Sequence, residues 1–420
     1  MKKYLLSALS LFVCILAIGE PISSKQAMEI ATNYLTKSGA PRRAAAQMSV
    51  QSFMTDRQGN PLMYAVNNGG EGYVIVSGDD RMRQVLGYSN SGSLDFADMP
   101  SNMRYWLQGL CADMQMLMDA DYQPQAADSR RAAADVKPAI SSMVPCHWGQ
   151  STPYNDLCPT DNGGRTLTGC VATAIAQVLY YHKKVRQADI PSTPLKDTEA
   201  YTSQTGIKMN ALKAQDYTID WNQLIEEYTS NKVTPTAAQN QNIAKLMYFC
   251  GAALYMDYSS IVSLASDADM APMLINYFGF SPATRLVKRT SYSEQQWADL
   301  MYNELKNGRP VLYGGVSTAG GHMFMLDGYD GNEMFHINWG WNGNCDNYFA
   351  LSVLNYDESF PIGARESTAG FAAFQSAVIN AEYGGTAQAA NRLSYHSSKI
   401  VDSNEIEFGL INKTGGNQYF

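Results

Sequence analysis

Apolar residues recur at helical spacing in several separate stretches of the chain. The first stretch begins at Ser24 and is broken by Pro41. Its apolar positions are three or four residues apart, as on one face of a helix: Ala27, Ile30, Ala31, Tyr34 and Leu35. The same spacing predicts helices over 102–119, from Gly169 onward, and over 238–254. A further helix is predicted from Ser293, which forms a capping box with Gln296, to a stop at Gly308.

Short apolar runs between turn residues predict strands. Two of them, 61–66 and 73–77, lie between the first two helices, so residues 20–119 are expected to form a small mixed α/β unit. Four more follow the last helix and predict an antiparallel sheet: 311–313, 322–327, 334–338 and 348–351. Helices first and a sheet second indicate an α+β fold for residues 136–384. Residues 385–420 are polar with one strand-like run, 406–410, and are interpreted as an extension that starts a β module.

The segment from Ala120 to Pro138 has no apolar periodicity and is interpreted as a solvated linker that is open to cleavage. It contains Arg130-Arg131-Ala132-Ala133-Ala134, which repeats the string at residues 42–46. Two such copies in unpatterned stretches indicate processing sites, although coincidence in an Ala-rich chain would give the same repeat.

The first residues have the pattern of a secretory signal peptide. Lys2 and Lys3 precede an apolar run over 4–18, and Ala17-Ile18-Gly19 is a small-x-small cleavage signal. We therefore assign residues 1–19 to a signal peptide and interpret Cys14 as part of its apolar run. No later stretch reaches the length that a membrane span requires, so none is predicted.

Composition narrows the functional classes. The 45% hydrophobic content is enough for a sizeable core, and a net charge of −8 argues against a nucleic-acid-binding protein. Six cysteines follow Cys14, and this number is low for a disulfide scaffold of this length. There is no C-x-x-C motif. With five histidines in the whole chain, a zinc site has little support, and we expect no metal or organic cofactor.

Cys170 is the first candidate for chemistry. It follows Gly169 and opens a predicted apolar helix, where unpaired backbone N–H groups favour a thiolate. Gly169 has no side chain, so a substrate backbone could approach closely. The alternative is a small apolar cysteine packed in a core.

His322 is the second candidate, because it begins a buried strand directly after two glycines. A histidine at the mouth of a strand is well placed to face a cleft, although a loop histidine would look the same. By contrast, His182 follows an apolar helix beside two lysines and is predicted to be a cation at the helix end. His336 lies inside a strand and is predicted to be structural, whereas His147 and His396 have no partner motif.

Two further motifs could complete such a site. Asn338 could hold an imidazole tautomer and Trp339 could shield it from water, although a hairpin with aromatic packing would also use them. Upstream, the Gln150 side chain could donate a hydrogen bond to an oxyanion together with the backbone N–H of Cys170.

In combination, these residues resemble the streptopain and interpain family of bacterial papain-like cysteine peptidases. The matching motifs are Gln150 with Thr152–Asn155, Gly169–Ala174, Gly320–His322, Asn338–Trp341, Met256–Tyr258 and, in the first unit, Gly87–Gly92. The resemblance covers roughly residues 22–384 and does not extend to 385–420.

The resemblance implies a papain-like domain with a helical left side, a sheet right side and an active site between them. It implies Cys170 as nucleophile, His322 as base, Gln150 as oxyanion donor, and Asn338 and Trp339 as supports of the histidine. It further implies that residues 20–135 form an inhibitory propeptide and that the partners are protein or peptide substrates. Gly321, Gly169, Trp341 and the segment after Tyr258 are expected to line the substrate groove.

Two other classes remain open at this point. One is a different acyl-transfer enzyme, such as a transglutaminase-like protein, which would require an Asp beyond the histidine. Asp327 is five residues from His322, and strand alternation puts it on the opposite face. The other class is a secreted binding module without catalytic activity.

Overall fold

The computed structural model describes residues 19–37, 47–124, 137–317, 320–355, 375–384, 393–402 and 405–412. We refer to residues 19–124 as the N-terminal unit and to residues 137–384 as the second unit. The N-terminal unit has this order of elements: α1 (Ser24–Lys37), β1 (Met48–Thr55), β2 (Pro61–Asn68), β3 (Tyr73–Ser77), β4 (Val85–Ser89) and α2 (Ser101–Asp119). Residues 1–18 of the predicted signal peptide and both copies of the Arg-Arg-Ala string lie outside the described residues.

The second unit begins with helices and ends with strands. Its main helices are α3 (Cys170–Tyr180), α4 (Ala237–Ala253), α5 (Met270–Phe278) and α6 (Glu294–Lys306). Its main strands are β9 (Arg285–Lys288), β10 (Val311–Ser317), β11 (Gly320–Tyr329), β12 (Phe335–Asn338), β13 (Asn347–Phe349) and β14 (Gln375–Ile379). Small two-residue ladders pair β5 (Thr160–Asp161) with β6 (Gly164–Arg165) and β7 (Tyr201–Thr202) with β8 (Lys208–Met209).

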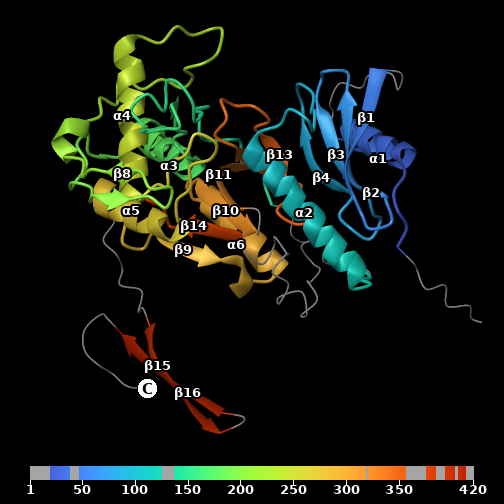
Figure 1. The fold of residues 1–420 in the computed structure, drawn as a ribbon. Helices are drawn as coiled ribbons and strands as arrows, with labels where there is room; N and C mark the ends of the chain where they lie inside the picture. Colours follow the sequence, from blue (N-terminus) through green and yellow to red (C-terminus); the bar gives the residue numbers. More distant parts are fainter. Residues whose placement is uncertain are drawn as a thin grey trace, which may run out of the picture.

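One ten-stranded antiparallel sheet runs through both units, in the order β1-β2-β3-β4-β13-β12-β11-β10-β14-β9 (Figure 1). The junction is the pairing of β4 with β13, where Tyr348 lies opposite Tyr88 and Phe349 lies opposite Gly87. The N-terminal unit therefore covers an edge of the second unit's sheet that would otherwise present unpaired backbone groups.

Helices cover both faces of this sheet. On one face α2 and α6 share a hydrophobic core with β10 and β11, in which Trp106 of α2 meets Tyr313 and Phe324. On the other face α1 packs on β2 and β3, whereas α3, α4 and α5 form the core of the helical half of the second unit. Alternation along β11 divides its residues between the two cores, since Met323 and Met325 face α3 whereas Phe324 and Leu326 face α2.

Several predicted element ends are confirmed, because they depend on local chemistry. Helix α6 starts after Ser293, whose hydroxyl accepts from the Gln296 backbone in a full capping box, and it ends before Gly308 at φ +70°. Helix α4 likewise starts with a capping box, between Thr236 and Gln239. The α+β class and the mixed character of the N-terminal unit are also confirmed.

Other elements were missed by the sequence patterns. The structure adds β1, β4, β9, β14 and α5 to the predicted set. The predicted strand at 406–410 lies within β16 (Glu405–Asn412), which pairs with the unpredicted β15 (Leu393–Asp402) in a separate sheet. Strands such as β9 and β14 are short and polar in part, and tertiary pairing decides their conformation.

We predict that Gly87→Val destabilises the chain through the junction between the units. A Cβ atom at Gly87 would lie 2.7 Å from Cδ1 of Phe349, which is too close without movement. We expect the free energy of unfolding, measured by urea denaturation, to fall by about 1–3 kcal/mol. Ser52→Val on the exposed side of β1 is the matched control, because valine suits a strand there. Equal stability of the two variants would contradict the role given to the junction.

Candidate active site

Cys170 is the first residue of α3, and Gly169 is the N-cap with φ +88°. Only 6% of Cys170 is exposed, and its Sγ accepts a hydrogen bond from the backbone N–H of Met323 at 3.3 Å. Burial raises the pKa of the Cys170 thiol, while the N–H groups of Met323, Val171 and Cys170 itself act in the opposite direction. The thiol is therefore uncharged in this structure but already surrounded by donors that would stabilise a thiolate.

His322 lies in β11 and is the residue before Met323, so the strand brings it beside Cys170. Its ring packs edge-on against Tyr105 of α2, with 4.9 Å between the ring centroids. Burial lowers the pKa of His322 to about 4, because a charged imidazole would lose its hydration there. Among the described residues, no hydrogen bond joins His322 to Cys170.

A cavity of about 310 Å³ opens beside these two residues. Leu264, Ala265, Ser266 and Asp267 line one side of it, in the segment that follows Tyr258. The rest of the lining comes from the start of α3 and from β10 and β11: Cys170, Val171, Gly315, Gly321, His322 and Met323. The cavity could therefore hold part of a chain whose carbonyl group lies at Cys170.

Gln150 is buried and lies next to the turn that precedes Cys170. Its backbone oxygen accepts from the N–H of Thr168 at 3.1 Å, two residues before Cys170. The structure thus brings Gln150, Cys170 and His322 to one region from three distant parts of the sequence.

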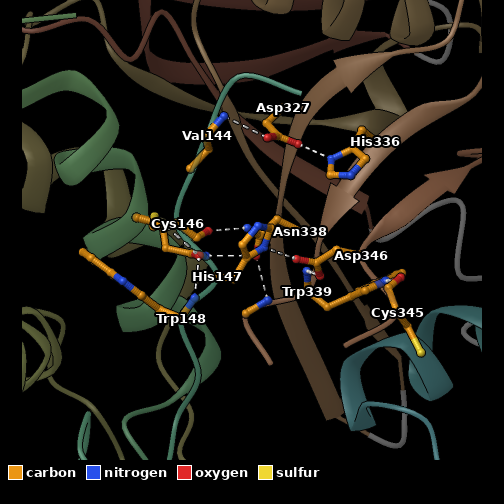
Figure 2. Close-up of polar contacts among 12 residues, drawn as sticks. Val144, Cys146, His147, Trp148, Asp327, His336, Asn338, Trp339, Cys345 and Asp346 are labelled. Atoms are coloured by element: carbon orange, nitrogen blue, oxygen red, sulfur yellow. Dashed lines mark hydrogen bonds and ion pairs between the residues drawn. The ribbon is translucent and has the colours of Figure 1, made fainter. Parts of the chain in front are cut away.

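Asn338 lies at the end of β12, and its side chain binds the segment at Cys146 (Figure 2). Its Nδ2 donates to the oxygen of Cys146 at 3.0 Å, and its Oδ1 accepts from Gln177 at 3.2 Å and from the Gly340 N–H at 3.0 Å. The expectation that Asn338 orients His322 is therefore not met in this structure. Asn338 instead fixes the segment that leads from Cys146 to Gln150.

Gln177 is a residue that the sequence analysis missed. It is a buried amide in the otherwise apolar helix α3, and its Oε1 accepts from the Trp148 N–H at 3.2 Å. Together with its bond to Asn338, this contact joins α3, the Gln150 segment and β12. A polar residue in an apolar helix is the signal that could have found it.

Trp339 is fully buried, and its indole points into the core rather than over His322. Its Nε1 donates to Cys345 at 3.0 Å, and its ring lies 4.7 Å from that of Phe324. The Trp339 oxygen accepts from the side chain of Asn102, at the start of α2. In this structure the aromatic neighbour of His322 is Tyr105, a residue that the sequence analysis did not single out.

The expected groove residues are not all in the groove. Gly321 lines the cavity, whereas Gly169 and Trp341 do not. A Cβ atom at Gly169 would lie 2.7 Å from Sδ of Met256, so the absent side chain makes room for protein packing rather than for a substrate. Trp341 is partly buried against the core that contains α2.

Asp327 and His336 form a pair (Figure 2), and strand alternation puts Asp327 on the opposite face of β11 from His322. Oδ1 of Asp327 lies 2.5 Å from Nδ1 of His336, and its Oδ2 accepts from the Val144 N–H at 3.0 Å. Burial lowers the pKa of His336, but the Asp327 carboxylate outweighs burial and raises it overall. These contacts agree with a structural His336 and leave Asp327 unsuited as a third catalytic member.

The predicted charge on His182 is wrong. The helix continues past it in a π-helical turn, Tyr181–Val185, and only 2% of His182 is exposed. Burial lowers its pKa to about 4, so the imidazole is neutral, with its ring 5.0 Å from that of Phe280. His147, which had no partner in the sequence, lies 3.3 Å from Oδ2 of Asp346.

Within the described part of the chain, all six cysteines are free and no group of three or more candidate ligands could hold a metal ion. The described helices also include none that is long and apolar enough to span a bilayer.

We predict that Asp327→Asn lowers stability without changing the reactivity of Cys170. The amide can still accept from Val144, but His336 loses its charged partner, so the free energy of unfolding should fall by about 1–3 kcal/mol. Asp197→Asn, in an exposed pair with Lys213, is the control and should leave the free energy of unfolding nearly unchanged. Urea denaturation and the rate of Cys170 alkylation by iodoacetamide give the two readouts. Slower alkylation with unchanged stability would give Asp327 a role in the chemistry.

Comparisons with known proteins agree with this geometry. The model of the Peptidase C10 family matches residues 148–349, and that of the Spi protease inhibitor matches residues 19–114. Streptopain from Streptococcus pyogenes serotype M28 is 30% identical over 385 residues, which are 85% of this chain and 91% of streptopain. The thiol protease/hemagglutinin PrtT from Porphyromonas gingivalis is 27% identical over 90% of this chain, which spans 44% of PrtT.

A solved structure shows the same arrangement. A mutant fragment of prointerpain A from Prevotella intermedia superposes with a TM-score of 0.64 and 28% identity, covering 81% of this chain and all of the fragment. The N-terminal unit therefore corresponds to a propeptide, and the second unit has a papain-like fold. The chain belongs to the Peptidase C10 family, that of streptopain and interpain, and is a cysteine endopeptidase with a propeptide.

Proposed function

We propose that the chain is a secreted endopeptidase, made as a zymogen, that hydrolyses proteins through a Cys170–His322 dyad and a thioester acyl-enzyme. The observation that carries the proposal is the position of Cys170. It lies at the N-terminus of α3, on a cavity that it shares with His322. Lys2, Lys3 and the apolar run that follows them support export.

The reaction starts when His322 is free of the N-terminal unit. Exposure of the imidazole to water returns its pKa toward the ordinary value near 6.5, so that it can accept the thiol proton. The N–H groups of α3 and of Met323 then stabilise the thiolate, since they already surround the sulfur.

In the first half-reaction, Sγ of Cys170 attacks the peptide carbonyl carbon. The resulting tetrahedral oxyanion binds the N–H of Cys170 and the side chain of Gln150, and each such donor is worth roughly 2.7–4 kcal/mol of transition-state stabilisation. The C–N bond breaks as His322 gives its proton to the leaving amine, and a thioester remains.

In the second half-reaction, His322 takes a proton from water, and the hydroxide attacks the thioester carbon. The C–S bond breaks, the acid product leaves and Cys170 recovers its proton. Asn338 and Trp339 act as positioning residues, because their contacts hold the Gln150 segment and the sheet beside His322.

The N-terminal unit inhibits the enzyme by holding His322 away from this chemistry. Tyr105 packs on the imidazole and Asn102 binds the oxygen of Trp339, so two residues of α2 cover this side of the site. The lowered pKa of His322 makes it a weak base, and burial raises the pKa of the Cys170 thiol, so the thiol keeps its proton.

Maturation removes the N-terminal unit by cleavage between Ala120 and Ser142. On one side of this window Tyr122 is bound to α2, where its N–H donates to Leu117 at 2.9 Å. On the other side Ile140 and Tyr329 exchange two backbone hydrogen bonds of 2.7 Å. Cleavage between these anchors leaves both units intact, and the predicted Arg130-Arg131 site falls there, outside the described residues.

We predict that Cys170→Ala and His322→Ala each abolish casein hydrolysis by the mature enzyme. Alanine at 170 replaces one small residue with another, so the fold should persist and the residual rate should stay below about 1% of wild type. His182→Ala and His336→Ala are controls, which should lose stability rather than the chemical step. A folded His182→Ala variant without activity, alongside an active His322→Ala variant, would contradict the assignment.

We predict that Tyr105→Ala makes Cys170 more reactive in the uncleaved precursor. Loss of the ring lets water reach His322, which can then accept the thiol proton. Alkylation of Cys170 by iodoacetamide at pH 7 should become at least about tenfold faster. The thiolate is the reactive form, and lowering the thiol pKa by one unit raises the thiolate fraction about tenfold. Tyr105→Phe keeps the ring and is the matched control. Equal rates in the two variants would show that the ring does not restrain His322.

We predict that maturation depends on Cys170. Pure Cys170→Ala precursor should stay at full length and be trimmed between Ala120 and Ser142 once traces of active enzyme are added. Mass spectrometry of both samples gives the cut positions. Trimming of the variant alone at the wild-type rate, or a mature N-terminus beyond His147, would contradict self-processing.

A further inference from the structure

In the loop from Ser259 to Ser263, apolar side chains are exposed to solvent and a polar side chain is buried, which is the reverse of the usual arrangement. Ile261 is 85% exposed and Val262 is 40% exposed, whereas Ser263 is 2% exposed. Leu264, the next residue, is 38% exposed and lines the cavity beside Cys170. Exposed apolar side chains lose the hydrophobic stabilisation that burial would give them, so a cluster of them indicates a binding surface.

The loop is held rigidly in this arrangement. Asp257 and Leu264 exchange backbone hydrogen bonds of 2.7 and 3.1 Å, which close the base of the loop. Inside it, the Ser263 hydroxyl donates to the oxygen of Leu167 at 2.7 Å, and the Leu167 N–H donates to Ser259 at 3.1 Å. Ser263 and the backbone of Ser259 thus anchor the loop to the segment before Gly169, and Ile261 and Val262 are left facing solvent.

The surface continues the catalytic cavity. Leu264 belongs to both, and Ile261 is three residues away, at most about 11 Å along an extended chain. A peptide bound with its reactive carbonyl at Cys170 and one side chain in the cavity needs only one or two more residues to reach this loop. Beside the site, Tyr105 and Asn102 of α2 contact His322 and Trp339, which are not part of the loop.

We propose that Ile261, Val262 and Leu264 form an apolar subsite for a hydrophobic side chain of the substrate, at the third or fourth residue before the scissile bond. This inference rests on the proposed peptidase function. The subsite acts with the cavity, so that the enzyme selects substrates with apolar residues in two neighbouring regions on the acyl side. Full contact with an apolar side chain would shield Ile261 and Val262 from water and favour such substrates.

The test uses matured enzyme and two fluorogenic peptide amides that differ only at the third and fourth residues before the bond, leucine in one and serine in the other. We expect the wild type to cleave the leucine peptide with a kcat/KM about tenfold higher. The double variant Ile261→Ser, Val262→Ser should reduce this ratio to about twofold or less. Only kcat/KM for the leucine peptide should fall, and the rate of Cys170 alkylation should equal that of the wild type. Leu195→Ser is the matched control, because Leu195 is 57% exposed but does not line the cavity.

Binding separates this inference from the proposed function. The same two peptides are titrated into Cys170→Ala protein that has been trimmed by traces of active enzyme, with and without the two loop substitutions. If the two loop substitutions abolish the preference for binding the leucine peptide, the subsite is supported. This holds even if the wild type hydrolyses neither peptide, because failure of hydrolysis would contradict only the proposed function. An unchanged preference in the double variant, or an equal loss in Leu195→Ser, would overturn the subsite.

Discussion

The contact of Trp106 with Phe324 is the interaction on which the arrangement of this precursor depends. The two rings meet edge-on with 5.3 Å between centroids, in a core that α2 shares with the sheet of the second unit. Phe324 is two residues beyond His322 on β11, and Tyr105 precedes Trp106 on α2. Seating Trp106 in the core therefore also brings Tyr105 against His322, so one packing contact also places the ring that we propose restrains the histidine.

In the proposed mechanism, this arrangement blocks the chemistry at His322 rather than at Cys170. Cys170 keeps its position at the N-terminus of α3 and its hydrogen bond from Met323. Among the described residues no hydrogen bond joins His322 to the thiol, and loss of hydration lowers the pKa of His322, which makes it a weaker base. Release of α2 would restore the base without a change in the fold of α3.

Two sets of hydrogen bonds support the segments around Cys170. Asn338 and Gln177 form a buried network that joins the sheet to the Gln150 segment, and the Ser263 hydroxyl joins the Ser259–Ser263 loop to the segment before Gly169. Both networks are satisfied within the protein, and buried networks of this kind fix a geometry more than they stabilise a fold. The nucleophile is thus positioned from two sides, while α2 acts on the histidine.

The sequence by itself determined what depends on local chemistry. The capping box at Ser293, the stop at Gly308 and the placement of Cys170 at a helix start all follow from residues within one turn of each other. The combined motifs of Gln150, Cys170, His322 and Asn338-Trp339 were specific enough to indicate the family.

Only the tertiary structure decided the contacts between distant segments. Sequence patterns could not show that β4 pairs with β13, that Tyr105 lies on His322, or that Asn338 binds Cys146 and Gln177 instead of the histidine. The same limit explains the error at His182, where a polar residue beside lysines is buried because the helix continues into the core. Burial and long-range pairing depend on which surfaces meet in the fold, and periodicity along the chain carries no information about that choice.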